Sequence, residues 1–418
     1  MPMKSKLSFW LPALALFAAP ATHAEDLAAR ARRLHQSAIV VDSHIDAPDQ
    51  LITKWADVGT RGATTHFDIP RAREGGLTAP FFSIYVPGSF AETGGAARRA
   101  LELIDLTYRV VEEHPRDMLL ATSVADIRRA KQAGKIAVLM GIEGGHAIED
   151  SLGALRAFHR AGVRYMTLTH TNTNNWADSS GPFYLPDFDP AASAVHHGLT
   201  DFGREVVREM NRLGMIVDIS HVGDATLDQV LAVSRAPVLA SHSSCKVFSD
   251  IPRNLTDDQI RRIAAKGGVV MINFGTLFLD QAATDEWRKD LAARKPEYLK
   301  LKQQYAKDPK KLQEALRALL GGDQRTYKLA SWTKAIDHIE HVIQVAGPDA
   351  VGIGSDFDGI SDPPEGLEDV SLLPRITEEL LRRGHSEAEV RKVLGENFLH
   401  LFARVEAVAK SLANEPPH

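Results

Sequence analysis

Short apolar runs alternate with segments of helical periodicity along most of the chain. Eight runs have the length and composition of strands: residues 38–41, 80–86, 136–141, 164–169, 215–219, 237–240, 269–274 and 350–354. They are apolar throughout rather than alternately apolar and polar, as expected when both faces of a strand are covered. Strands of this kind, separated by helices, predict an α/β protein with a parallel sheet.

The segments between the runs carry the marks of helices. One places apolar side chains at helical spacing, namely Leu101, Ile104, Tyr108 and Val111. Two others begin with a capping box, in which an N-cap Ser or Thr precedes Glu or Gln by three residues: Thr256 with Gln259, and Ser386 with Glu389. Because eight parallel strands with intervening helices can close on themselves, we predict a (β/α)8 TIM-type barrel. An open doubly wound sheet is the alternative, but no G-x-G-x-x-G motif follows the first strand to support it.

Two segments interrupt this rhythm. Residues 171–199 form a long loop after strand four, rich in Asn, Asp, Pro and aromatic residues, in which Trp176 and Tyr184 are candidate walls of a pocket. Residues 278–332 are a charged, helical insertion between strands seven and eight. No internal repeat or linker indicates a second domain, so residues 25–418 are expected to form a single barrel domain.

The N-terminus has the pattern of a secretory signal. Lys4 and Lys6 precede an apolar run, residues 7–19, that is too short to span a bilayer, and small residues follow up to Ala24. We therefore expect a signal peptide over residues 1–24 and a mature protein exported to the periplasm. Neither a cysteine near the cleavage point nor an apolar C-terminal tail suggests a membrane anchor after cleavage.

Composition excludes some classes of function and leaves others open. The content of 44% hydrophobic and 25% charged residues is that of a soluble globular protein. A formal net charge of −5, without a basic stripe, gives no reason to expect a nucleic-acid partner. The single cysteine, Cys245, excludes an intramolecular disulfide and a thiolate zinc site. Any metal ion must be held by His and carboxylate side chains.

Such side chains follow several of the predicted strands. In a (β/α)8 barrel the carboxyl ends of all strands meet at one end, where functional residues collect. Burying these groups without a metal would require costly pairing, whereas coordination satisfies several of them at once. Imidazole and carboxylate ligands suit Zn, with Mn, Fe or Co as alternatives. The residues at these ends are His44, Asp46, Glu143, His170, His221, His242 and Asp356.

With these motifs in this order, the sequence resembles the membrane (renal) dipeptidase family of the amidohydrolase superfamily, over nearly the whole mature chain. The resemblance rests on VDSHID at 41–46, GIEGGH at 141–146, RYMTLTH at 164–170, DISHV at 218–222, SHSS at 241–244, RN at 253–254 and GIGSDFDG at 352–359. The first motif departs from the family pattern, which usually has Gly and Asn at the positions of Ser43 and Ile45. We expect this departure to alter the shape of the pocket but not metal binding.

The resemblance implies a binuclear zinc site and a role for each motif residue. His44 and Asp46 would hold one zinc ion, His221 and His242 the other, and Glu143 would bridge the two. A hydroxide bridging both ions would attack the peptide carbonyl of a dipeptide. The resemblance also assigns substrate contacts and proton transfer: His170 would polarise the carbonyl oxygen, Asp356 would carry the proton to the leaving amine, and Arg253 would bind the substrate's α-carboxylate. It further implies acceptance of a C-terminal D-residue, and a homodimer.

Two rival functions use the same residues. The chain could be another binuclear amidohydrolase that acts on a β-lactam, a lactone or an N-acyl amino acid. It could also be a catalytically silent barrel that binds peptides. The loss of a metal ligand or of Asp356 would have indicated the silent barrel, and all are present.

Overall fold

The computed structural model describes residues 26–320 and 325–418. The expected signal peptide, residues 1–24, lies outside the described residues. Over the ranges that are described, no helix combines the length and the apolar character needed to cross a membrane.

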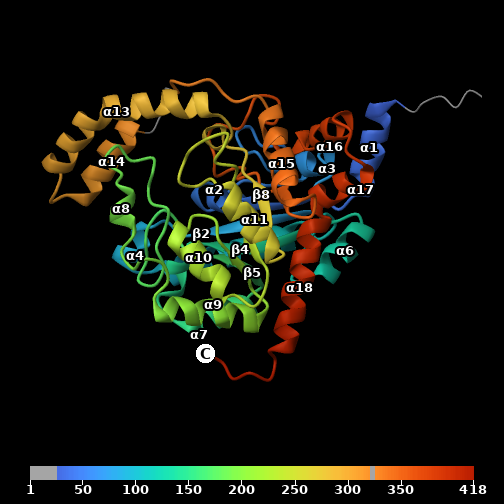
Figure 1. Cartoon of the computed structure of the whole chain (residues 1–418), viewed down its shortest axis with the longest axis horizontal. Helices are drawn as coiled ribbons and strands as arrows, with labels where there is room; N and C mark the ends of the chain where they lie inside the picture. The colour runs from blue at the N-terminus through green and yellow to red at the C-terminus, as the bar shows by residue number, and fades with distance from the viewer. Residues whose placement is uncertain (1–25, 321–324) are drawn as a thin grey trace, which may run out of the picture.

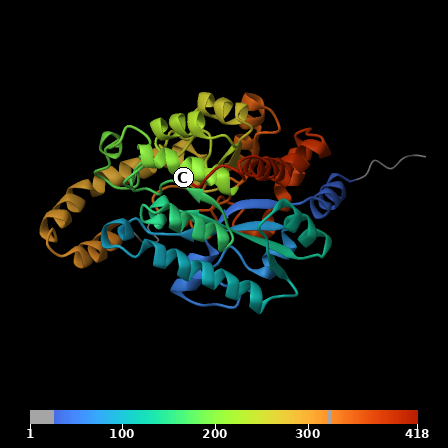
Figure 2. The same ribbon diagram turned by 90° about the horizontal axis from the view of Figure 1, so that it is seen from below.

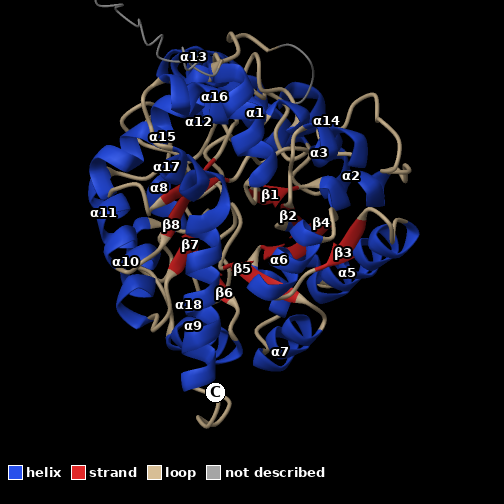
Figure 3. Ribbon diagram, turned by 90° about the vertical axis from the view of Figure 1, so that its right-hand side faces the viewer, coloured by secondary structure: helices blue, strands red, loops and turns tan. Residues whose placement is uncertain are grey.

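Eight parallel strands close into a barrel, which confirms the predicted fold (Figure 3). The strands follow one another around the barrel as β1 (Val41–Ile45), β2 (Ala79–Tyr85), β4 (Ile136–Glu143), β5 (Val163–Thr167), β6 (Ile216–Asp218), β7 (Val238–Ala240), β8 (Val269–Ile272) and β9 (Val351–Ile353). The pairing of β2 with β4 and of β1 with β9 completes the circle. Almost every strand residue is buried, in keeping with the unbroken apolar runs.

The sequence pattern missed one strand and misplaced the start of another. A ninth strand, β3 (Met118–Leu120), pairs with the first residues of β4 and takes no part in closing the barrel. Its length is not the reason, since β6, β7 and β9 also have three residues; β3 lies outside the closed barrel, and two of its three residues are only partly buried. The first predicted strand, residues 38–41, lies three to four residues too early, because β1 carries its ladder through the polar residues Asp42 to His44.

Helices surround the barrel on its outside (Figure 1). They are α1 (Leu27–Ser37), α2 (Ala47–Thr53), α3 (Ile69–Glu74), α4 (Ser89–Thr93), α5 (Ala96–Glu113), α6 (Val124–Gln132), α7 (Leu152–Arg160), α8 (Pro190–Ser193), α9 (Asp201–Leu213), α10 (Asp224–Val233), α11 (Asp257–Ala265), α12 (Thr276–Leu279), α15 (Thr333–Ala346), α16 (Pro374–Arg382), α17 (Glu387–Arg391) and α18 (Asn397–Ser411). Both predicted capping boxes are present, at the starts of α11 and α17.

The barrel interior is filled by apolar side chains except at its carboxyl end. Strand residues such as Phe81, Leu139 and Tyr165 form one buried cluster with Phe398 and Phe402 of α18. Each large side chain buried in this way contributes roughly 1.5–3 kcal/mol to stability. The polar residues at the strand ends therefore rest on a packed apolar floor.

The segment 278–332 contains two long helices, α13 (Gln281–Gln304) and α14 (Pro309–Leu320), which stand out from the side of the barrel (Figures 1 and 2). Their base packs on the long loop, since the ring of Trp287 lies 5.7 Å from that of Phe183. Lys302 also forms an ion pair of 2.6 Å with Asp187. The insertion (residues 278–332) and the long loop (residues 171–199) thus pack against one another.

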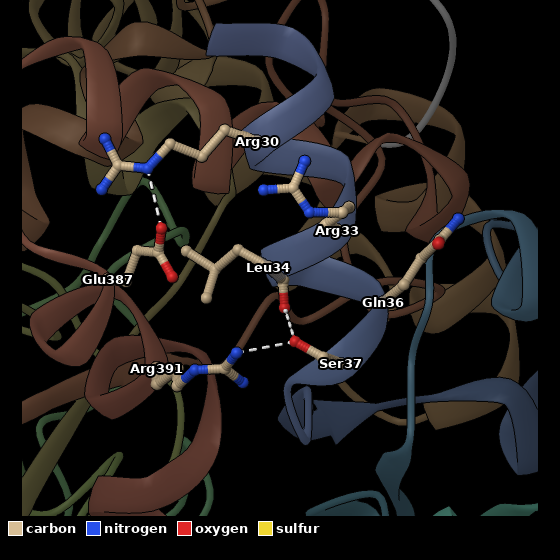
Figure 4. A pocket seen from close by; sticks show the side chains of 7 residues that line it. All are labelled: Arg30, Arg33, Leu34, Gln36, Ser37, Glu387 and Arg391. Carbon is tan, nitrogen blue, oxygen red and sulfur yellow. Dashed lines mark hydrogen bonds and ion pairs between the residues drawn. The ribbon is translucent and has the colours of Figure 1, made fainter. Parts of the chain in front are cut away.

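A hollow of about 530 Å³ lies between α1 and α17 (Figure 4). Because α1 leads directly into β1, this hollow belongs to the amino end of the barrel, away from the polar strand ends. Arg30 pairs with Glu387 at 2.7 Å, and Arg391 donates a hydrogen bond of 2.7 Å to Ser37 (Figure 4). These contacts join the first helix to α17 and leave the candidate chemistry at the opposite end.

Candidate metal centre

The five predicted metal ligands meet at the carboxyl end of the barrel. His44 lies in β1, Asp46 directly after it, Glu143 at the end of β4, and His221 and His242 in the turns after β6 and β7. All five are buried. The structure therefore brings together residues that are separated by up to 198 positions in the sequence.

Two ring nitrogens converge on one oxygen of Glu143. The Nε2 atoms of His221 and His242 lie 3.0 and 3.3 Å from Glu143 Oε1, and 2.9 Å from one another. At that separation two N–H groups cannot face each other, so at least one lone pair points into the cluster. Lone pairs and a carboxylate oxygen that converge in this way suit a cation.

A second cluster faces the other oxygen of Glu143. His44 Nε2 lies 3.5 Å from Glu143 Oε2, 3.4 Å from Asp46 Oδ2 and 4.0 Å from Asp356 Oδ1. This nitrogen is buried and has no hydrogen-bond partner among the described residues. Glu143 thus presents one oxygen to each of two neighbouring clusters.

The protonation states of His221, His242 and Glu143 suit metal binding. Burial disfavours the imidazolium form and places the pKa of His221 and of His242 well below the ordinary value, so both rings are neutral at pH 7. Burial alone would raise the pKa of Glu143, but His44, His221 and His242 together hold it well below its ordinary value. Neutral imidazoles and an ionised carboxylate are the forms that bind metal ions.

Two residues of the centre adopt a left-handed backbone conformation, which is unfavourable for residues other than glycine. His221 and Asp356 have φ values of 67° and 64°, in the left-handed region. Gly359 approaches the carboxylates closely, since a Cβ atom there would lie 2.3 Å from Asp46 Oδ2 and 2.6 Å from Asp356 Oδ1. Only glycine leaves room for both carboxylates to face His44.

The two residues expected to act in catalysis lie at the rim of the centre. His170 Nε2 is 3.9 Å from Glu143 Oε1, and burial lowers the pKa of this histidine to about 4, so its ring is neutral. Asp356 Oδ2 accepts a hydrogen bond of 2.8 Å from Asn273. Burial raises the pKa of Asp356 to about 8, with His44 opposing the increase and Asp46 and Glu143 adding to it.

Arg253 is a buried cation without a buried anion beside it. Its side chain donates to the carbonyl of His242 at 3.0 Å and to Ser243 Oγ at 3.3 Å, and its guanidinium lies 5.5 Å from the ring of Phe278. The residue is 3% exposed, yet no carboxylate of the described chain lies within ion-pair distance of it. Because an unpaired buried charge is costly, this site favours an anionic ligand.

The residues expected to shape the substrate pocket differ in how far they are buried. Ser43 and Ile45 are fully buried. Ser43 donates a hydrogen bond to the carbonyl of Ser241, and Ile45 packs in the core. That these two side chains alter the shape of the pocket stays a prediction. Trp176 is wholly buried against Phe202 and cannot wall a pocket, whereas Tyr184 is exposed at the surface.

Sequence reasoning overlooked two residues that orient the centre. Tyr165 places its hydroxyl 2.7 Å from His44 Nδ1, and Gly141 makes this possible, because a Cβ atom at Gly141 would lie 2.0 Å from the tyrosine ring. Asn273 donates a hydrogen bond to Asp356 and directly follows β8. It could therefore have been predicted from the rule that functional residues collect at the carboxyl ends of barrel strands. Tyr165 lies within a strand, where an aromatic residue gives no sign of contact with a ligand.

Replacing Tyr165 by Phe is expected to weaken metal binding about 10–100-fold while the fold is retained, because outer contacts that orient a ligating histidine have effects of that size. With the lone pair of His44 Nε2 facing the cluster, Nδ1 carries the ring hydrogen and donates a hydrogen bond to the tyrosine oxygen. Competition with a chromophoric chelator would measure the change. Equal affinity in the two proteins would show that the hydroxyl does not orient His44.

Comparison with known proteins gives a consistent result. The model of the family described as membrane dipeptidase (peptidase family M19) matches residues 28–416. The probable dipeptidase PvdM from Pseudomonas aeruginosa is 27% identical, with a TM-score of 0.78 over 92% of this chain and 99% of that one. A metallopeptidase from Rhodobacter sphaeroides, liganded with a phosphinate mimic of the dipeptide L-Ala-D-Ala, is 27% identical, with a TM-score of 0.70 over 88% and 99% of the two chains. An amidohydrolase from Pseudomonas aeruginosa is 26% identical, with a TM-score of 0.66 over 90% and 98%.

Proposed function

The chain belongs to the membrane dipeptidase family, peptidase family M19, and from this premise we propose that it is a two-zinc enzyme that hydrolyses dipeptides with a C-terminal L- or D-residue. That it is a metal-dependent dipeptidase follows from the family; the number and identity of the ions, the stereochemistry and the residue roles are the proposal. The position of Glu143 carries it. One oxygen of this carboxylate faces His221 and His242, and the other faces His44.

The donor set agrees with two zinc ions, because imidazole and carboxylate groups without thiolate are common ligands of catalytic zinc. His44 and Asp46 would hold one ion and His221 and His242 the other, with Glu143 shared. Zinc ions at these ligands would lower the pKa of water towards neutrality and polarise the peptide carbonyl.

The chain's own residues would supply proton transfer and substrate binding. Asp356 stands within reach of His44 and Asp46 and is held by Asn273, so it is placed to accept a proton from water and deliver it to the leaving amine. Neutral His170 would donate a hydrogen bond to the carbonyl oxygen as negative charge develops there. Arg253, buried and without an ion pair to an acidic side chain of the described residues, would bind the free α-carboxylate with its planar guanidinium.

Acceptance of a C-terminal D-residue is supported by the Rhodobacter sphaeroides relative, which binds a mimic of L-Ala-D-Ala. Export to the periplasm is supported by the basic and apolar pattern of residues 4–24. Cell fractionation of the native host protein would test export, and a full-length cytoplasmic product would contradict it.

The proposed function is tested by amino-acid release from L-Ala-L-Ala, L-Ala-D-Ala and D-Ala-D-Ala before and after removal of metal. We expect chelation to abolish release from L-Ala-L-Ala and L-Ala-D-Ala, and two equivalents of zinc per chain to restore it. A β-lactam, a lactone and N-acetyl-alanine serve as competing substrates. Turnover of one of these, with no dipeptide cleaved, would favour the rival amidohydrolase function.

A further inference from the structure

A chain of buried polar groups runs behind His242, on the side away from Glu143. The Nδ1 atom of His242 lies 2.7 Å from Ser241 Oγ, and that hydroxyl lies 2.6 Å from Asp218 Oδ2. All three residues are at most 1% exposed. None of the roles assigned above includes Asp218 or Ser241.

The direction of each hydrogen bond follows from the chemistry of Asp218. Its Oδ1 accepts the backbone N–H groups of Ser220 at 3.1 Å and Ser241 at 2.9 Å, which cannot turn away. Its Oδ2 accepts the hydroxyls of Ser241 and of Thr167. Because the only hydrogen of Ser241 Oγ points to Asp218, the hydroxyl oxygen can only accept from His242.

We propose that Asp218 and Ser241 are positioning residues that set the tautomer of His242, keeping the ring proton on Nδ1 and the lone pair of Nε2 directed at the metal centre. The inference rests on the proposed function, since it takes His242 as a zinc ligand. It differs from the support of His44, whose Nδ1 contacts Tyr165, and of His221, whose Nδ1 has no partner among the described residues.

Replacing Asp218 by Asn is expected to reverse the direction of the hydrogen bonds between Asp218, Ser241 and His242 rather than merely weaken them. The two fixed N–H groups require the amide oxygen at the Oδ1 position, so the NH2 group must occupy the Oδ2 position and donate to Ser241 Oγ. The hydrogen of Ser241 then points to Nδ1 of His242, the nearest acceptor. The ring proton moves to Nε2, where the metal must bind.

The test measures zinc affinity by chelator competition for the whole enzyme and for Asp218→Asn, Ser241→Ala and the double variant. We expect Asp218→Asn to weaken binding about 10–100-fold, as the loss of an outer contact to a ligating histidine does. Ser241→Ala should weaken it less, because nothing then donates to Nδ1. The double variant should bind zinc more tightly than Asp218→Asn alone, since the misdirected hydrogen is gone.

A purely structural role predicts the opposite order, with the double variant weakest, and that order would overturn the proposal. Unchanged zinc affinity in Asp218→Asn would overturn it as well. Ser244→Ala is the matched control: this serine is equally buried but donates to the carbonyl of Asn273, so zinc affinity should not change.

Two further measurements distinguish failure of this proposal from misfolding of Asp218→Asn and from failure of the proposed function. If Asp218→Asn does not fold, long-range ¹H–¹⁵N NMR of the metal-free enzyme and of Ser241→Ala decides the matter, with signals assigned through a His242→Gln variant. The His242 ring should carry its proton on Nδ1 in the unaltered enzyme, and an Nε2–H ring would overturn the proposal. Failure of the unaltered enzyme to bind zinc or cleave dipeptides would instead refute the proposed function.

Discussion

Glu143→Gln is expected to abolish dipeptide hydrolysis and metal binding together. The carboxylate faces three imidazole rings, with one oxygen 3.0 and 3.3 Å from His221 and His242 and the other 3.5 Å from His44. The amide keeps the shape of the side chain but removes its negative charge and turns an NH2 group towards one cluster. One ion would lose this ligand and the other would keep only a neutral amide oxygen, so the effect should exceed the roughly 10–100-fold that an outer contact is worth.

The measurements are the zinc content after dialysis and the rate of L-Ala-D-Ala cleavage. We expect less than one equivalent of zinc per chain and a fall in kcat/KM of at least about 10⁴-fold, since in the proposed function the metal ions would supply both water activation and carbonyl polarisation. A variant that retains two zinc ions would show that Glu143 is not the bridging ligand.

Glu379→Gln provides the matched control. The two glutamate side chains are exposed to similar extents, 8% for Glu379 and 6% for Glu143, but Glu379 pairs with Arg382 and Arg383 on the outside of the barrel. Its replacement should lower stability without changing zinc content or kcat. Loss of activity in both variants would point to general destabilisation as the cause.

Asp356→Asn is expected to leave both metal ions in place and to lower kcat by about 10²–10⁴-fold, the range that general acid–base catalysis contributes. Asp356 adopts a left-handed backbone conformation with φ of 64°, which Asn tolerates well, so the substitution adds little strain. The amide can still contact Asn273 but can no longer accept and return a proton. Zinc analysis and steady-state kinetics on the same preparation would separate the two effects.

Asp356 also belongs to a group with His44 and Asp46 that could itself hold a metal ion. Loss of zinc together with activity in Asp356→Asn would assign it as a ligand instead. Asp358→Asn is the control, because Asp358 has the same backbone conformation (φ 67°) but accepts the backbone N–H groups of His66 and Phe67. It should lower stability and leave kcat close to that of the unaltered enzyme.

The sequence predicted the barrel strands and the candidate ligands better than the residues that surround them. Continuous apolar runs predicted all eight barrel strands, because a strand covered on both faces has no polar side to hide. The same rule failed for β3, which lies outside the barrel and is only partly buried, and for the start of β1, where the ladder continues through Asp42 and His44. A polar residue near the end of a strand has the sequence pattern of a loop, because its buried hydrogen-bond partners cannot be seen in the sequence.

Trp176 shows the same limit in the long loop. Its size and its position near a candidate site suggested a pocket wall, yet it is packed against Phe202 in the core. Nothing in the sequence around it distinguishes a loop aromatic that points inwards from one that points outwards, because the difference depends on a helix about 25 residues further along.

By itself, then, the sequence determined the barrel, the end of it that carries the chemistry, and the residue types that meet there. These depend on local periodicity and on the rule that parallel strands bring their carboxyl ends together. Only the tertiary structure decided how each ligand is aimed. Glu143 faces two clusters, Tyr165 reaches His44 from 121 positions away through the space left by Gly141, and Asp218 orients His242 through Ser241. Such contacts join side chains across the barrel, and their geometry exists only once the strands have closed.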